Sequence, residues 1–240
     1  MSAPRFFVDQ LRPGAVELTP DDSRHALRSL RLRPNEPVTL ADGRGQVGTG
    51  RLAGENRGRA VVQIERVEKV ESAKPVVTVA LAPPKGERLR WAVQKLAELG
   101  VDRMVVLRTE RSVRAWEDTR VENALARLRT TAREAAMQSR QAFLMVVEDG
   151  GELNRWLESA SSSKVLLWER AELPLRMGLP PTAGDVALLI GPEGGFSEAE
   201  VGAAQKAGAN VASLGPNVLR TETAAVVAAS LALAHYGRLG

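Results

Sequence analysis

The sequence has no cysteine and only two histidines among its 240 residues. Without cysteine the chain has no disulfide bond, no thiolate metal site and no cysteine nucleophile. His25 and His235 lie near opposite ends of the chain, so neither a histidine-based zinc site nor a Ser-His-Asp triad is expected. The sequence therefore predicts a protein that binds no metal.

Long apolar runs are also missing. No segment reaches the roughly 18 consecutive apolar residues of a transmembrane helix, and Met1–Gln10 lacks the pattern of a secretory signal peptide. Hydrophobic residues make up 44% of the chain and charged residues 26%, as is typical of a folded globular protein. We expect no membrane partner and a cytoplasmic location.

The positive charge is concentrated in one part of the chain. The net charge of +4 divides into +2 over residues 1–72, +6 over 73–145 and −4 over 146–240. Arginine supplies 27 of the 33 basic residues, and its planar fork binds phosphates and stacks on bases. Charge alone favours a nucleic acid partner only slightly over a general compositional bias towards arginine.

Residues 1–72 predict a small β-barrel domain with one helix. Thr19 is a typical helix N-cap, and Asp42-Gly43 is typical of a hairpin turn. The polar stretch from Val70 to Pro75 then breaks the pattern, and we place a domain boundary there. Strands are expected at Arg5–Val8, Pro37–Ala41, Gln46–Leu52 and Arg59–Val70.

Residues 73–240 alternate apolar strands with helices, which predicts a second domain with a parallel α/β sheet. The expected strands are Val76–Leu81, Met104–Leu107, Lys164–Trp168, Val186–Ile190 and Val211–Leu214. The expected helices are Glu87–Leu99, Glu117–Arg140, Ser197–Ala207 and Thr221–Tyr236. Ser197 and Glu200 form a capping-box pattern at the start of the third helix.

One glycine pattern is rejected as a nucleotide site. Residues 43–48 match the dinucleotide-binding pattern GxGxxG, but that motif needs a strand before it and a helix after it. Here a strand follows, so a glycine-rich hairpin is the better interpretation. The chain also lacks a P-loop.

Two loops in the second domain are stronger candidates for a ligand site. Residues 188–197 run from a buried strand through three glycines into a capped helix, and three glycines exceed what a tight turn needs. Residues 214–223 repeat the arrangement one unit later. In an open α/β sheet, ligands bind at the carboxyl ends of strands.

The last expected helix begins with polar residues and continues with apolar ones. Thr221 is a good N-cap and Glu222 a good first-turn residue, whereas Arg220 opposes the helix dipole, a conflict found at functional sites. The helix that follows is apolar all round, which fits a subunit interface and a central core helix equally well.

Both loops resemble the hallmark loops of a known family. Leu-Ile-Gly-Pro-Glu-Gly-Gly-Phe at 189–196 and Leu-Gly-Pro-x-x-Leu-Arg-Thr-Glu-Thr-Ala at 214–224 are similar to those of the RsmE family, the 16S ribosomal RNA uridine N3-methyltransferases of the SPOUT superfamily. Pro4–Phe7, Lys85–Val101 and Arg133–Ser139 resemble other parts of the same family.

The resemblance implies a PUA-like β-barrel followed by a SPOUT domain with a C-terminal trefoil knot. It also implies a homodimer that acts on 16S rRNA of the small ribosomal subunit. The cofactor would be S-adenosyl-L-methionine, held by Leu167, Trp168, Glu169, Ile190, Gly191, Pro192, Glu193, Gly194, Gly195, Leu214, Gly215, Asn217, Val218, Leu219 and Thr223.

The implied chemistry assigns the remaining residues. Uridine N3 must lose its proton before it attacks a methyl group, and a fixed cation would stabilise the anion. Arg220 is the first candidate for that cation, and Glu222 is a candidate proton acceptor beside its helix-capping role. RNA contacts are expected from Arg5, Arg24, Arg28, Arg31, Arg33, Lys85 and Arg88.

Two alternatives remain open. The chain is also compatible with a SPOUT RNA methyltransferase that acts on another base or on a ribose 2′-hydroxyl. It is compatible as well with a non-catalytic RNA-binding factor in ribosome assembly that kept the fold.

Overall fold

A five-stranded sheet carries the first unit of the computed structural model, which describes residues 3–112, 121–181 and 184–240. The strand order is β1-β3-β4-β5-β2, with β1 parallel to β3 and the other pairs antiparallel. Their bounds are β1 Arg5–Phe7, β2 Gly14–Glu17, β3 Pro37–Ala41, β4 Gln46–Asn56 and β5 Arg59–Lys69. The predicted strand-rich domain is confirmed. Only the four-residue β2 escaped prediction.

One helical segment covers this sheet. α1 (Pro20–Arg24) begins at Thr19, whose Oγ1 accepts a hydrogen bond from the Asp22 backbone N–H, and a π-helical turn (His25–Ser29) continues it. Phe6, Leu18, Leu40, Leu52 and Ile64 are fully buried in the core of the unit. The glycine pattern at 43–48 lies on the turn between β3 and β4 and the start of β4, as predicted.

Residues 133–144 also belong to the first unit, although they follow the start of the second in sequence. Arg133, near the end of α3 (Val121–Gln138), donates from Nη2 to Asp22 Oδ2 at 2.6 Å and to the Phe7 carbonyl at 3.0 Å. Asp22 is only 4% exposed. The sequence predicts this segment in the second domain, because local periodicity contains no information on such distant ion pairs.

The second unit is built on a six-stranded parallel sheet of order β11-β9-β10-β6-β7-β8. The strands are β6 Val77–Leu81, β7 Arg103–Arg108, β8 Val146–Glu152, β9 Ser163–Leu167, β10 Val186–Ile190 and β11 Asn210–Ala212. The predicted parallel sheet is confirmed. β8 was missed because its sequence is rich in acid and glycine, which are uncommon in strands.

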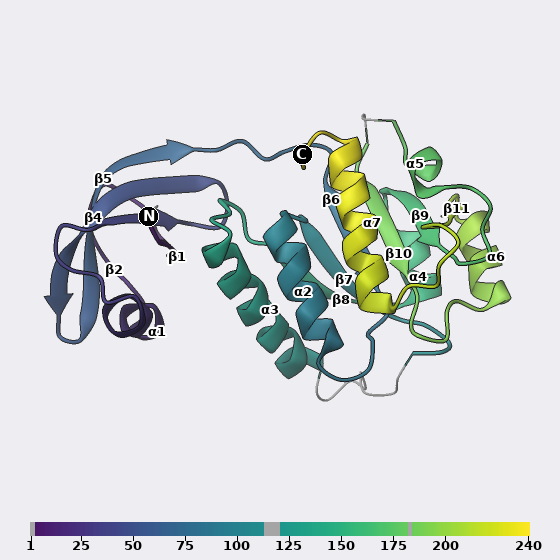
Figure 1. Ribbon diagram of the computed structural model, residues 1–240, viewed down its shortest axis with the longest axis horizontal. Coiled ribbons are helices and arrows are strands. Elements are labelled where there is room, and N and C mark those ends of the chain that lie inside the picture. Colours follow the sequence, from purple (N-terminus) through teal and green to yellow (C-terminus); the bar gives the residue numbers. More distant parts are fainter. Residues whose placement is uncertain (1–2, 113–120, 182–183) are drawn as a thin grey trace. The chain divides into compact units, whose positions relative to one another are not determined.

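Helices cover both faces of this sheet (Figure 1). α2 (Arg88–Leu99) and α7 (Thr221–His235) pack together, and α7 contacts β6 and β10. Leu153 and Leu157 of α4 (Leu153–Ser159) and Val201 of α6 (Glu198–Lys206) join the core cluster on the sheet. A short helix, α5 (Leu175–Gly178), completes the set among the described residues.

Two helices differ from their predictions. The long helix expected at 117–140 has its first four residues outside the described part of the chain, and it ends at Gln138. α7 is a core helix on one side, since Ala225, Ala228 and Leu233 are completely buried, while Leu231 is 48% exposed. The apolar composition of α7 thus reflects core packing on one side, while the apolar side chain of Leu231 is exposed on the other side.

The ion pair between Arg133 and Asp22 gives a test of the first unit. Arg133→Met leaves a buried carboxylate without its partner, so we expect the free energy of unfolding to fall by about 3 kcal/mol. Urea denaturation followed by circular dichroism measures the change. The matched control is Arg66→Met, which breaks the exposed pair with Glu68 in the same unit and should cost less than about 1 kcal/mol. Equal losses for both variants would contradict this account.

Candidate functional site

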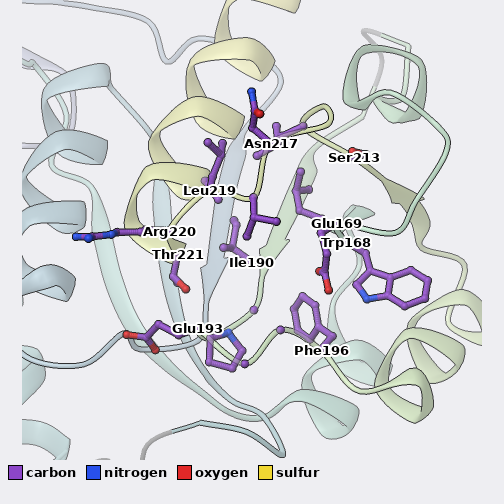
Figure 2. A pocket seen from close by; sticks show the side chains of 18 of the residues that line it. Trp168, Glu169, Ile190, Glu193, Phe196, Ser213, Asn217, Leu219, Arg220 and Thr221 are labelled. Carbon is purple, nitrogen blue, oxygen red and sulfur yellow. The ribbon is translucent and has the colours of Figure 1, made fainter.

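Three loops at one edge of the parallel sheet enclose a cavity of about 390 Å³. They follow β9, β10 and β11, whose carboxyl ends meet because the three strands are parallel and adjacent in the order β11-β9-β10. Figure 2 shows their side chains around a common space, with the start of α7 on one side. The lining residues are Leu167–Glu169, Ile190–Phe196, Ser213–Gly215, Asn217–Thr221 and Ala224.

The structure brings together nearly all residues that the sequence assigned to a cofactor. Thr223 is the exception, since it lies in the first turn of α7 but does not line the cavity. Phe196, Ser213, Thr221 and Ala224 line it and were missed. Each follows or precedes a predicted residue, so only the extent of the loops was misjudged.

The three glycines of the loop after β10 each have a local structural reason. A Cβ at Gly191 would come within 3.2 Å of the Phe196 backbone nitrogen, and one at Gly194 within 3.3 Å of Arg111 Cδ. Gly195 has a φ of +67°, which side chains rarely adopt. Tight packing at Gly191 and Gly194 and the positive φ of Gly195 thus give each glycine of this loop a structural reason beside any role in ligand binding.

The first turn of α7 differs from the prediction. Arg220 occupies the N-cap position with extended backbone, and Thr221 is the first helical residue, so Thr221 is not the cap. Arg220 is exposed, and Figure 2 shows its guanidinium directed away from Trp168 and Glu169. The positive charge of Arg220 therefore lies at the rim of the cavity, away from Trp168 and Glu169.

Glu222 is buried and does not line the cavity. Its Oε1 lies 3.7 Å from Nε of Arg88, and its Oε2 has no hydrogen-bond partner within the described ranges. The carboxylate therefore serves as a counter-charge to Arg88 in this arrangement. Its predicted second role, as a first-turn acid on the helix dipole, agrees with its position in α7.

Arg88 and Lys85, both predicted RNA contacts, lie beside the loop after β10. Glu193 Oε1 accepts a hydrogen bond from the Lys85 backbone N–H at 3.0 Å and lies 3.4 Å from Arg88 Nη1. Burial alone would raise the pKa of Glu193, but the backbone hydrogen bonds and the charges of Arg88 and Lys85 outweigh it and lower that pKa. Glu193 is therefore held as a carboxylate at the cavity rim.

The predicted RNA-binding arginines of the first unit fall into two groups. Arg5 is partly buried and donates to Thr39 Oγ1 and to the Arg140 carbonyl, and burial followed by the charge of Arg140 lowers its pKa. Its position is thus fixed by the fold. The other group is exposed on the surface, with Arg24 paired to Asp21, and comprises Arg24, Arg28, Arg31 and Arg33.

Among the described residues, no group of three histidine, aspartate or glutamate side chains is placed to hold a metal ion. Within the same ranges, no helix has the length and apolarity to cross a membrane.

Comparison with known proteins agrees with this architecture. Residues 71–233 match the RNA methyltransferase domain family, and residues 18–65 match the RNA methyltransferase PUA domain. The ribosomal RNA small subunit methyltransferase E of Mycobacterium bovis is 36% identical over 238 residues, covering 95% of this chain and 90% of that protein.

Solved structures give the same result. The crystal structure of a ribosomal RNA small subunit methyltransferase E from Neisseria gonorrhoeae bound to S-adenosyl methionine superposes with a TM-score of 0.86 at 30% identity, covering 97% of this chain and 98% of that one. A Legionella pneumophila protein, crystallised with the same cofactor, has a TM-score of 0.86 at 31% identity, with 98% of both chains covered.

The fold and the cavity thus define the class as an RNA methyltransferase with a PUA-like domain and a SPOUT-type α/β domain. Within that class, the chain belongs to the ribosomal RNA small subunit methyltransferase E family. The resemblance of the two loops at 189–196 and 214–224 is confirmed.

Two glycines test the packing of the site. A Cβ at Gly191 would press against backbone atoms that cannot rotate away, so Gly191→Ala should destabilise the protein by about 1–3 kcal/mol. Gly202, in α6, has open space around its Cβ position, so Gly202→Ala should stabilise it by about 0.5–1 kcal/mol. Thermal unfolding of both variants measures the contrast, and changes of the same sign would refute it.

Proposed function

We propose that this protein uses S-adenosyl-L-methionine to methylate N3 of a uridine in 16S rRNA of the small ribosomal subunit. The observation that carries the proposal is the cavity formed by the loops after β9, β10 and β11. The same fold binds this cofactor in the Neisseria gonorrhoeae relative. Because its proposed substrate is 16S rRNA, we place the enzyme in the cytoplasm.

The residues of the cavity suit this cofactor. Leu167, Ile190 and Leu219 supply apolar walls, and Gly191 presents a backbone without a side chain. Glu169 brings a carboxylate to the cavity wall, complementary to a ligand with sulfonium and ammonium charges. When bound, the cofactor supplies an electrophilic methyl group.

Arg220 is the proposed catalytic cation. Uridine N3 is protonated at neutral pH, and its negative charge after deprotonation spreads over O2 and O4. A guanidinium has a planar set of donors that can bind both oxygens of such an anion. Arg220 lies at the cavity rim with its guanidinium pointing outwards, where an entering base would meet it.

Glu222 has a different part in this proposal. Its buried position and its approach to Arg88 favour the structural role over that of proton acceptor. We infer that Glu222 keeps Arg88 close to the rim, beside Glu193. No separate general base is needed if Arg220 stabilises the uridine anion enough for solvent to accept the proton.

RNA contacts are assigned to two surfaces. Arg24, Arg28, Arg31 and Arg33 are exposed on the first unit, and an arginine cluster of this kind binds phosphates with a salt-dependent affinity. On the second unit, Arg220 lies at the cavity rim, and Arg88 and Lys85 contact its Glu193. We also propose the trefoil knot, which the resemblance to the RsmE family implies for this domain.

The proposed function is tested by methylation of small subunits that lack the modification. Wild-type protein should produce N3-methyluridine, identified by mass spectrometry of the nucleosides. Arg220→Lys keeps the charge but loses the planar fork, so its single-turnover rate should fall about 100- to 1000-fold. Cofactor affinity should stay within a few-fold, because the interaction acts on the transition state.

Several results of these assays would contradict parts of the proposed function. Methylation of another base or of a ribose would refute the uridine N3 assignment. A protein that binds RNA but no S-adenosylmethionine would refute enzymatic activity. A wild-type rate for Arg220→Lys would show that Arg220 only borders the loop, and recovery of its rate at high pH would identify lowering of the N3 pKa as its main task.

We propose that the exposed side of α7 joins two copies of the chain. Leu231 is 48% exposed on α7, and Val227, one turn earlier on the same side of the helix, is partly exposed, so the helix carries a strip of uncovered apolar surface of the kind that favours association. Sedimentation should show a dimer for the wild type and a monomer for Leu231→Glu. Ala234 is an exposed alanine three residues after Leu231, on the same side of the helix. Ala234→Glu should therefore also weaken the dimer. A monomeric wild type would refute the interface.

A further inference from the structure

The turn after β7 is attached to the loop after β10, although the sheet places β6 between these two strands. Thr109 and Ser112 close the turn, since the Ser112 backbone N–H donates to the Thr109 carbonyl at 3.0 Å and the Thr109 N–H donates to Ser112 Oγ at 2.9 Å. The two residues inside the turn, Glu110 and Arg111, are the ones that reach the other loop.

The first attachment is made by Glu200 of α6. Its carboxylate is buried, and both oxygens are used. Oε2 accepts from the Ser197 backbone N–H at 2.8 Å, as part of the capping box, and Oε1 accepts from the Glu110 backbone N–H at 2.8 Å. One buried carboxylate thus accepts hydrogen bonds from both loops, and a buried carboxylate is costly to leave without such partners.

The second attachment is made by Arg111. Its Nη1 donates to the Gly194 carbonyl at 2.7 Å, a short hydrogen bond from a charged donor. The aliphatic part of the same side chain packs against Gly194, with Cδ at 3.3 Å and Cβ at 3.4 Å from the position that a Cβ of residue 194 would take. Arg111 therefore fixes both the carbonyl and the outer side of Gly194.

Neither Arg111 nor Glu200 lines the cofactor cavity, whereas Gly194 does. Arg111 lines a neighbouring cavity of about 280 Å³, which shares Trp168, Glu169 and Phe196 with the first. Arg111 is also exposed, so its removal leaves no buried charge or empty core. Its hydrogen bond to the Gly194 carbonyl is the direct contact between Arg111 and the loop that lines the cofactor cavity.

We propose that Arg111 is a positioning residue for the cofactor loop. With Glu200 it forms a brace, defined here as these two side chains and their hydrogen bonds to Gly194, Glu110 and Ser197. The brace holds the loop in its binding conformation before the cofactor arrives, so that binding does not have to order it. This inference rests on the proposed function, since it assumes that the cavity holds S-adenosylmethionine.

The test is calorimetric titration of the full chain with S-adenosylmethionine. Arg111→Ala should raise Kd about tenfold, the typical effect of one hydrogen bond from a charged group. Arg111→Lys keeps the stem and one donor, so its Kd should lie between those of Arg111→Ala and wild type. The control is Arg155→Ala, an exposed arginine on α4, which should bind like wild type.

Kinetics separate positioning from other roles. In the methylation assay, Arg111→Ala should raise KM for the cofactor about as much as Kd, with kcat at saturating cofactor within about twofold of wild type. The melting temperatures of Arg111→Ala and Arg155→Ala should agree, because both side chains are exposed. If Arg111→Ala melts at a lower temperature than Arg155→Ala, Arg111→Lys decides, and an intermediate Kd at the wild-type melting temperature would support the brace.

Three results would overturn the brace. Equal cofactor affinity in wild type and Arg111→Ala would show that the hydrogen bond to Gly194 does not set the loop. An unchanged cofactor Kd with a raised KM for RNA would make Arg111 an RNA contact instead. A loss of kcat with unchanged cofactor KM would place it in the chemistry. If wild type itself fails to bind the cofactor, the proposed function falls first.

Discussion

The parallel pairing of β9 with both β10 and β11 is the constraint on which the site depends. Parallel strands end at the same edge of a sheet, so the residues after Leu167, Ile190 and Ala212 must meet there. A different strand order would scatter the same loops. This pairing places the three loops around one cavity. It also brings Arg220, Glu193 and the start of α7 to the rim of that cavity.

Close packing then gives the meeting loops a single shape. Gly191 admits the backbone of Phe196, Gly194 admits the side chain of Arg111, and Gly195 takes a backbone conformation that other residues avoid. Glu200 ties the helix after this loop to the turn after β7. A preformed loop loses less conformational freedom when a ligand binds, which is how packing outside a cavity affects affinity within it.

Charge is arranged around the cavity in a corresponding way. Glu169 and Glu193 bring carboxylates to the walls, and the pKa of Glu193 is held low by the Lys85 backbone N–H and by Arg88 against the opposing effect of burial. Arg220 and Arg88 then provide positive charge at and beside the rim, with Glu222 buried behind Arg88. A cationic cofactor inside and an anionic RNA outside would each find complementary charge.

The sequence by itself determined the two-part organisation, the parallel sheet and the two loops, because strand periodicity, glycine and capping residues are local signals. It also carried the family resemblance at 189–196 and 214–224. Only the tertiary structure decided that Glu222 faces Arg88, that Arg133 reaches Asp22, and that Arg111 holds Gly194. Those contacts join residues 83 to 134 positions apart, and their energies depend on burial and geometry that no local pattern in the sequence records.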